Sequence, residues 1–223
     1  MGHSLFDVIG CDTDSIIFNK PDGAPFSEEE RKNLLDELNK QFPDKIHWAD
    51  DGYYLKVIVL KAKNYILWDG KKLKTKGSSL KDPKREPALK QFIDEIIQTI
   101  IDNKNNFVEI YNKYVTEIND IKDINRWKTK KTISHKVMNP ERTTEQKILD
   151  AINGSEYNEG DRAYFYYRPD ESLSLIDKFD GLYHKDRYFM KLYKTALLFE
   201  NVINKDIFIN YSLKRSKKLM GNL

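Results

Sequence analysis

The sequence predicts an α+β protein, in which a short antiparallel sheet is followed by a mainly helical part with a small β element. Within residues 1–77, β-branched and apolar runs of strand length are separated by turn residues. Apolar residues recur at helical spacing over 28–42 and, more strongly, over 89–101. A tyrosine-rich run at 163–167 has the composition of one further strand. We therefore expect two parts, residues 1–77 and 78–223.

The composition limits the class of protein. The chain has 223 residues, a hydrophobic content of 39%, a charged content of 33% and a net charge of +3. No apolar run approaches the ~20 residues that cross a bilayer, so no membrane partner is expected. The start of the sequence lacks the pattern of a secretory signal. The single cysteine excludes an internal disulfide and fits a reducing compartment, which indicates a cytoplasmic protein.

The first element is an acidic hairpin. Residues 8–18 place Asp12 and Asp14 between two β-branched, apolar runs, and the acidic centre favours a turn. Residues two apart on an extended backbone point to the same side, so the two carboxylates are expected to face one point. One or two carboxylates together with water and substrate phosphates are the usual ligands of Mg²⁺. A plain acidic turn is the alternative, because short acidic triplets are common.

A turn and a helix are expected next. Residues 21–23 have turn composition, and Ser27 with Glu30 forms the pattern of a capping box. The following apolar spacing predicts a helix over 28–42, which Pro43 ends.

Three strands should complete the first part. Residues 53–60 and 63–68 are apolar and β-branched or aromatic, and a turn at 69–70 leads into a third strand at 72–76. The order of a hairpin, a helix and three strands indicates an α+β unit with an antiparallel sheet.

The second part is mainly helical. Pro87 suits the first turn of a helix whose apolar stripe runs to residue 101. The remaining elements that we expect are a helix at 107–118, a basic, β-leaning segment at 126–137, a helix at 144–153, a strand at 163–167, a helix at 186–203 and a basic tail from 214.

Positive charge is concentrated locally on this nearly neutral chain. Such clusters suit a protein that grips a polyanion on one face, although ordinary solvated lysine explains any single cluster. In the stretch 61–65, alternation puts Lys61, Lys63 and Tyr65 on one face of a strand, where they could follow a phosphate backbone or simply face solvent. The lysine-rich stretches are 61–90, 126–136 and 214–218.

Several of these segments resemble motifs of family B DNA polymerases. The string G-C-D-T-D-S at 10–15 resembles motif C, usually Y-G-D-T-D-S, with Cys11 either extra to the pattern or in place of a glycine. Lys63 and Tyr65 match the primer-gripping K-K-x-Y motif, in which Ala62 departs from the first lysine and Lys61 could substitute for it.

The resemblance continues through the second part in the family's order. The thumb's basic strand is matched around Lys130 and Lys131, its G-D-x-[VA]-x-[YF] strand at 160–165, and its D-x-x-Y-Y helix at 186–189. The K-x-K-G element and the arginine-bearing loop that open the thumb are matched by Lys74, Lys76, Gly77, Lys84 and Arg85.

The resemblance implies a function and a set of ligands. Residues 1–77 would be the C-terminal part of the palm, and 78–223 the thumb, of a DNA-directed DNA polymerase that acts on a primer–template duplex and dNTPs. It assigns Mg²⁺ of a two-metal site to Asp14 directly, with Asp12 in support and Thr13 beside them. The lysines, the arginine, Tyr65 and Gly77 named above would contact DNA.

The family's exonuclease, motif A aspartate and fingers helix have no match in this sequence. The resemblance therefore implies a larger partner subunit that carries them, as in a divided polymerase of viral or phage type, or else an expression fragment. A viral protein of this kind would work in the host cytoplasm or at a replication site. Family members often end in a peptide that binds a sliding clamp, although 212–223 lacks the usual paired aromatics.

Two other functions remain open at this point. The chain could be a non-catalytic thumb that binds duplex DNA while its acids are vestigial. It could also be an unrelated Mg²⁺-dependent phosphohydrolase that uses the acidic pair, which offers no reason for the ordered basic motifs downstream.

Overall fold

A computed structural model describes residues 7–12 and 14–212. The chain divides into two compact units, Met1–Lys76 and Gly77–Leu223, which we call the N-unit and the C-unit. Thr13, the basic tail from residue 214 and nearly all of the expected clamp-binding peptide lie outside the described residues. The mixture of helices with small antiparallel sheets confirms the predicted α+β class.

The N-unit begins with the hairpin that the sequence predicts. Strand β1 (Asp7–Asp12) pairs with β2 (Ser15–Asn19), and the two form a sheet by themselves. Helix α1 (Glu28–Lys40) follows, and both hydrogen bonds of the predicted capping box between Ser27 and Glu30 are present. These elements are fixed by local chemistry, namely a tight turn and a helix cap.

The remaining strands of the N-unit form a second, separate sheet. Strands β3 (Lys56–Lys61), β4 (Asn64–Trp68) and β5 (Leu73–Lys76) pair in that order, all antiparallel. The expectation of one antiparallel sheet in this part is therefore corrected, because β1 and β2 pair only with each other among the described strands.

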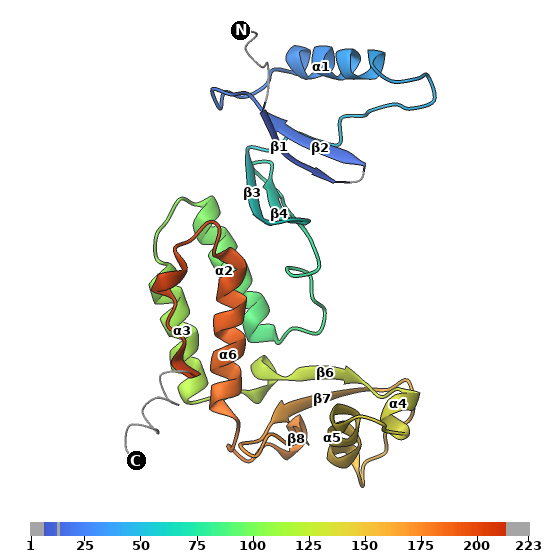
Figure 1. The fold of residues 1–223 in the computed structure, drawn as a ribbon. Helices are drawn as coiled ribbons and strands as arrows, with labels where there is room; N and C mark the ends of the chain where they lie inside the picture. The colour runs from blue at the N-terminus through green and yellow to red at the C-terminus, as the bar shows by residue number, and fades with distance from the viewer. Residues whose placement is uncertain (1–6, 13, 213–223) are drawn as a thin grey trace. The chain divides into compact units, whose positions relative to one another are not determined.

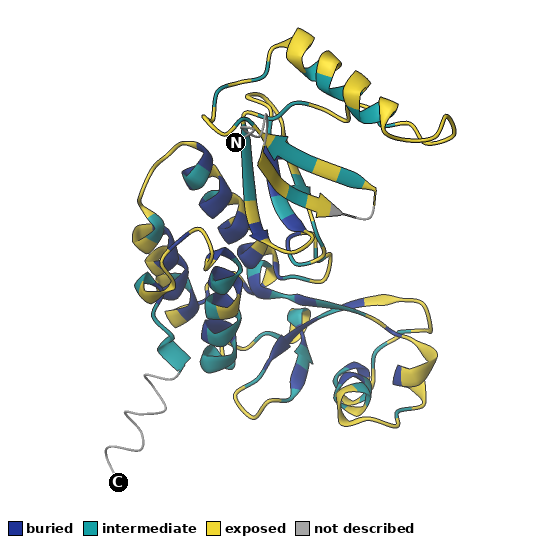
Figure 2. Ribbon diagram, turned by 45° about the horizontal axis from the view of Figure 1, so that its top comes forward, coloured by how far each residue is buried: buried dark blue, intermediate teal, exposed yellow. Residues whose placement is uncertain are grey.

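The N-unit has little core of its own. Its buried apolar side chains are Leu60, Ile66 and Leu67, and α1 buries no residue among those described. Figure 2 shows the hairpin and α1 in the colours of exposed and intermediate residues. Large apolar side chains of this unit that are exposed are those of Val8, Ile9, Ile16, Phe42, Ile46, Leu55, Val59 and Leu73.

The C-unit is organised around three helices. Helices α2 (Pro87–Ile101), α3 (Phe107–Asn119) and α6 (Lys185–Ala196) pack side by side (Figure 1). The apolar stripe predicted for α2 is buried, and Pro87 stands in its first turn as expected. The largest fully buried side chains of the C-unit are those of Trp127, Tyr111, Tyr114, Tyr166, Tyr188, Phe92, Phe165 and Phe199.

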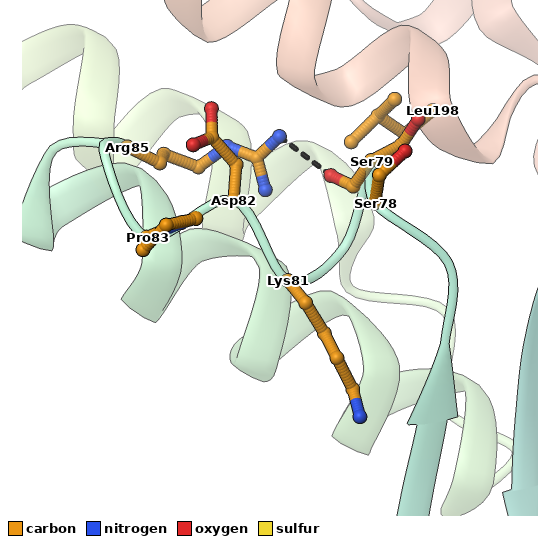
Figure 3. A pocket seen from close by; sticks show the side chains of 7 residues that line it. All are labelled: Ser78, Ser79, Lys81, Asp82, Pro83, Arg85 and Leu198. Carbon is orange, nitrogen blue, oxygen red and sulfur yellow. Dashed lines mark hydrogen bonds between the residues drawn. The ribbon is translucent and has the colours of Figure 1, made fainter.

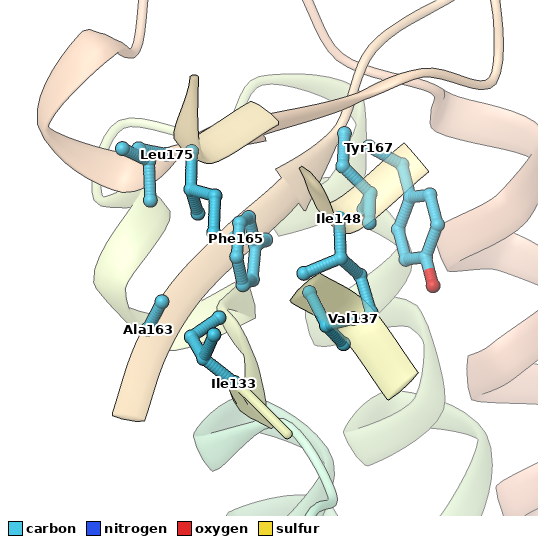
Figure 4. Close-up of a cluster of buried hydrophobic side chains, with 9 residues drawn as sticks. Ile133, Val137, Ile148, Ala163, Phe165, Tyr167 and Leu175 are labelled. Atoms are coloured by element: carbon cyan, nitrogen blue, oxygen red, sulfur yellow. The ribbon is translucent and has the colours of Figure 1, made fainter. Parts of the chain in front are cut away.

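A small sheet builds a second apolar cluster. Strands β6 (Thr129–Thr132), β7 (Arg162–Tyr167) and β8 (Leu173–Leu175) are antiparallel and pack with α4 (His135–Met138) and α5 (Thr143–Ile152). Figure 4 shows this cluster, whose buried members are Ile133, Val137, Ile148, Ile152, Ala163, Phe165, Tyr167, Leu173 and Leu175.

The boundaries in the C-unit differ from the expected ones in two places. The basic segment 126–137 is a strand only over β6, between a 3-10 turn (Ile124–Trp127) and α4. Helix α6 ends at Ala196 instead of 203, because the chain tightens into a 3-10 turn at Leu197–Phe199. Phe199 and Ile203 are nevertheless buried, so the apolar periodicity continues past the end of the helix.

A buried carboxylate joins three elements of the C-unit. Glu86, immediately before α2, is 4% exposed, and it accepts hydrogen bonds from Nζ of Lys191 on α6 and from Oγ1 of Thr129 on β6, the latter at 2.9 Å. Removing a buried carboxylate from water is costly, so its two partners must stay in place.

We expect Lys191→Met to lower the free energy of unfolding by about 3 kcal/mol, because it leaves a buried carboxylate without its counter-ion. Urea unfolding followed by circular dichroism measures the effect. Lys194→Met, at an exposed position of the same helix, is the matched control and should change stability by less than about 0.5 kcal/mol. Equal effects of the two substitutions would contradict the assignment.

No helix within residues 7–12 and 14–212 is both long enough and apolar enough to cross a membrane.

Candidate functional site

The tip of the first hairpin carries the acidic pair. Strand β1 ends at Asp12 and β2 begins at Ser15, and these two residues are register partners, so Asp14 lies in the turn between the strands. Asp14 is exposed. Thr13 and the side chain of Asp12 lie outside the described part of the structure, so convergence of the two carboxylates stays a prediction.

The carboxylate of Asp14 is a donor of the kind that Mg²⁺ prefers. Carboxylate oxygens are the ligands that Mg²⁺ prefers, and it demands near-octahedral oxygen coordination. Across the described side chains, no group of three or more His, Cys, Asp or Glu residues could hold a metal ion. A two-metal centre at Asp14 would therefore need oxygen donors beyond the described residues.

The lysine–tyrosine segment folds differently from the expectation. Lys61 ends β3, Asn64 begins β4, and Ala62 and Lys63 form a tight turn between them. Lys63 has a φ of 60°, and the Asn64 side-chain amide donates to the carbonyl oxygen of Ala62 at 3.0 Å. The prediction that Lys61, Lys63 and Tyr65 share one face of a single strand is wrong, because the chain reverses between them.

The sheet register brings a different set of residues together. Tyr65 of β4 pairs with Lys76 of β5, and Leu67 pairs with Lys74. Because partners in an antiparallel pair lie on the same face, Tyr65, Lys74 and Lys76 share one face of the sheet. Lys74 Nζ lies 3.3 Å from the Tyr54 hydroxyl, whereas Lys76 is exposed.

A cleft links the acidic hairpin with the lysine-bearing hairpin. Its volume is about 210 Å³, and both hairpins of the N-unit contribute walls. The two candidate segments, which are far apart in the sequence, thus meet across one cavity. The residues that line it are Ile9, Gly10, Cys11, Ser15 and Ile17 from the first hairpin, and Val59, Lys61, Ala62, Lys63 and Tyr65 from the second.

The loop before α2 is shaped by Arg85. Its guanidinium donates to the carbonyl oxygens of Ser79 at 2.6 Å and Leu80 at 3.4 Å, and the side chain is half-buried (Figure 3). Burial lowers the pKa of Arg85, although an arginine stays charged because its ordinary pKa is so high. Gly77 opens the loop with a φ of 106°, a conformation that favours glycine. Arg85 therefore holds the loop backbone.

A pocket of about 450 Å³ lies beside this loop. Lys81 extends away from Arg85 in Figure 3, and Lys84 is exposed. These two ammonium groups are more accessible to a large ligand than the guanidinium of Arg85 is.

The two lysines of β6 point in opposite directions. Lys130 is the register partner of Tyr164, and Lys131 is the register partner of Ala163. Successive side chains of a strand lie on opposite faces, so Lys131 shares the face of the buried Ala163. One surface cannot bind both lysines equally.

Two candidate residues, Lys128 and Tyr164, were not predicted from the sequence. Lys128 precedes β6 in an extended conformation, and its Nζ lies 4.4 Å from the centroid of the Tyr164 ring. Lys128 and Lys130 are two residues apart in a segment predicted to be β-leaning. This spacing is the signal in the sequence that places both side chains on the same face of a strand.

The chain is similar to known proteins in its fold but not detectably in its sequence. Neither a protein-family model nor a curated protein sequence matches the chain. Solved structures do match. One of them is the family B DNA polymerase from the hyperthermophilic archaeon Pyrobaculum calidifontis, with a TM-score of 0.66 and 17% identity over 89% of this chain. The chain spans 27% of the length of that polymerase.

We expect Arg85→Ala to lower the free energy of unfolding by about 2 kcal/mol, because two charge-assisted hydrogen bonds to the loop backbone are lost. Thermal or urea unfolding of the chain measures it. Lys84→Ala, one residue away and exposed, is the control and should leave stability within about 0.5 kcal/mol. An unchanged unfolding midpoint in Arg85→Ala would show that the guanidinium does not hold the loop.

Proposed function

We propose that the chain is the C-terminal part of the palm, residues 1–77, together with the thumb, residues 78–223, of a DNA-directed DNA polymerase. The observation that carries this proposal is the cleft between the acidic hairpin and the lysine–tyrosine hairpin, in a chain with a family B polymerase-like fold. A polymerase needs carboxylates at the reacting phosphate and cations on the primer backbone. Lys61 and Lys63 line this cleft from one hairpin, and Ser15, the residue after Asp14, lines it from the other.

In this proposal the acidic tip holds Mg²⁺. Asp14 binds the metal directly and Asp12 supports it, with Thr13 between them in the sequence. When bound, the metal pair activates the primer 3′-hydroxyl and stabilises the charge on the leaving pyrophosphate of the dNTP. A further aspartate and the triphosphate-binding lysine must come from elsewhere.

The basic residues of the proposed palm hold the primer–template duplex. Lys61 ends β3 and Lys63 lies in the turn that follows, and both residues line the cleft together with Tyr65. Lys76 shares the face of Tyr65 and extends this surface along β5. Their contacts with phosphates would fix the position of the primer end relative to Asp14 without reading its sequence.

The uncovered surface of the N-unit supports a partner for this palm. A two-stranded hairpin is only marginally stable by itself, and Val8 and Ile16 of this hairpin are 59% and 38% exposed. Free strand edges and clustered exposed apolar side chains typically mark an interface. We infer that a larger polymerase chain with exonuclease, fingers and motif A covers this face, as in a divided polymerase of viral type.

A non-catalytic thumb that binds duplex DNA is the second candidate. The observation that favours it is the large buried core of the C-unit, which contrasts with the three buried apolar side chains described in the N-unit that carries the acids. Under this alternative the basic surfaces keep their role, and the acidic tip is an ordinary turn.

We expect Asp14→Ala to reduce nucleotide incorporation by more than about 100-fold in an assembly with the polypeptide that carries motif A and the fingers. The reason is that mutating even an outer-shell residue of a metal site lowers metal affinity or activity by about 10- to 100-fold, and Asp14 is proposed to bind the metal directly. Primer extension measures incorporation, and duplex affinity should stay unchanged. Asp44→Ala, at an exposed acid of the same unit, is the control.

If Asp14→Ala keeps full nucleotide incorporation, the acidic pair is not catalytic, and the non-catalytic DNA-binding thumb is the better of the two candidate functions. Phosphatase activity of the wild-type chain by itself, lost in Asp14→Ala, would instead favour a phosphohydrolase.

The proposed interface can be followed through Cys11, the single cysteine of the chain, which is exposed on β1. We expect its reaction with a thiol reagent to slow by at least about tenfold when the motif A polypeptide is added, because the hairpin becomes covered. Mass spectrometry of the modified chain measures the rate. An assembly that forms without protecting Cys11 would place the interface elsewhere.

A further inference from the structure

One face of the small sheet in the C-unit carries an ordered group of cations. The register of β6 and β7 places Lys130 beside Tyr164 and Thr132 beside Arg162. Lys128 precedes this strand in an extended conformation, so alternation puts it on the same face as Lys130. Lys128, Lys130 and Arg162 therefore line one side of the hydrogen-bonded strand pair.

Tyr164 differs from the rest of its tyrosine-rich run. Phe165, Tyr166 and Tyr167 are buried, whereas Tyr164 is partly exposed on the face of the lysines. The ammonium of Lys128 lies 4.4 Å from the centroid of its ring, which is the geometry of a cation–π contact. The ring thus holds one flexible lysine above the strand.

These cations are not neutralised. In the part of the C-unit that the structure describes, Lys128, Lys130 and Arg162 have no carboxylate within salt-bridge distance. Other cations of the same unit are paired: Arg126 binds Glu117 at 2.7 Å, and Arg168 binds Asp180 at 2.9 Å. The charges of Lys128, Lys130 and Arg162 are therefore available to an anionic ligand.

We propose that Lys128, Lys130 and Arg162 form a phosphate-binding face for duplex DNA, with Tyr164 as the residue that positions Lys128. This inference rests on the proposed polymerase function and specifies which side of the thumb sheet contacts the duplex. The partner is the DNA backbone, because side chains that offer positive charge, without a large apolar anchor, suit phosphates better than a protein surface.

Lys131 provides an internal control for the face. It belongs to the same strand, has the same charge and is also partly exposed, but it lies on the side of Ala163. A general effect of lost positive charge would be the same at Lys130 and at Lys131. A contact with one face would affect Lys130 alone.

The test is the salt dependence of duplex binding by the full chain, measured as fluorescence anisotropy of a labelled blunt duplex. Each phosphate contact contributes about 0.9 to the slope of log affinity against log salt. We expect that slope to fall by about 0.9 in Lys128→Ala, in Lys130→Ala and in Arg162→Ala. Lys131→Ala should keep the slope of the wild-type chain.

Tyr164 is tested as a positioning residue. Tyr164→Phe keeps the ring and should keep the wild-type slope, whereas Tyr164→Leu should reproduce the smaller slope of Lys128→Ala. Combining Tyr164→Leu with Lys128→Ala should lower the slope no further, because both remove the same contact. Circular dichroism shows that each variant is folded.

Two outcomes would contradict the proposed phosphate-binding face, and they are distinguishable. If the chain binds duplex DNA and Lys130→Ala and Lys131→Ala have equal slopes, the face is wrong while the proposed function stands. If the wild-type chain binds no duplex at low salt, the proposal that residues 78–223 are a DNA-binding thumb is wrong. The proposal of a phosphate-binding face is then wrong as well.

Discussion

The buried carboxylate of Glu86 is the constraint on which the arrangement of the C-unit depends. An ionised group that is 4% exposed must keep its partners, and those partners come from β6 and α6. Because Thr129 faces inward to bind Glu86, strand alternation forces Lys128 and Lys130 outward. One interaction in the interior therefore decides which charges the small sheet presents to its surroundings.

The two units solve the problem of burial differently. The C-unit buries long apolar stripes and several large aromatic side chains. The N-unit consists of hairpins and a capped helix whose formation is local, and its apolar side chains remain largely exposed. Local chemistry is sufficient to form such elements but not to enclose a core, since a core requires several layers. This asymmetry is the physical basis for inferring a covering partner.

Much of the fold could be predicted from the sequence. The capping box at Ser27, the stripe of α2 and the acidic hairpin follow from periodicity and turn chemistry, and the structure has all of them. The reversal at Lys63 was missed because a lysine at a φ of 60° is unusual, and no glycine marked the turn. The separation of the two sheets of the N-unit depends on tertiary pairing, which has no local signal.

The candidate site was less accessible to sequence reasoning than the fold. The expected cluster Lys61, Lys63 and Tyr65 used strand alternation across a segment that is in fact a turn. The opposite faces of Lys130 and Lys131 follow from alternation alone, but the internal partner of Thr129 is needed to know which face is outward.

The separate apolar cluster behind β6, β7 and β8 affects how the C-unit fluctuates. A subdomain with its own small interior can open while the three-helix bundle stays closed, and such sub-global opening costs less free energy than complete unfolding. Amide protons of α5 should then exchange with solvent by a cheaper route than those of α2. Unfolding of the C-unit would then proceed in two steps, with β6, β7, β8 and α5 opening before the three helices.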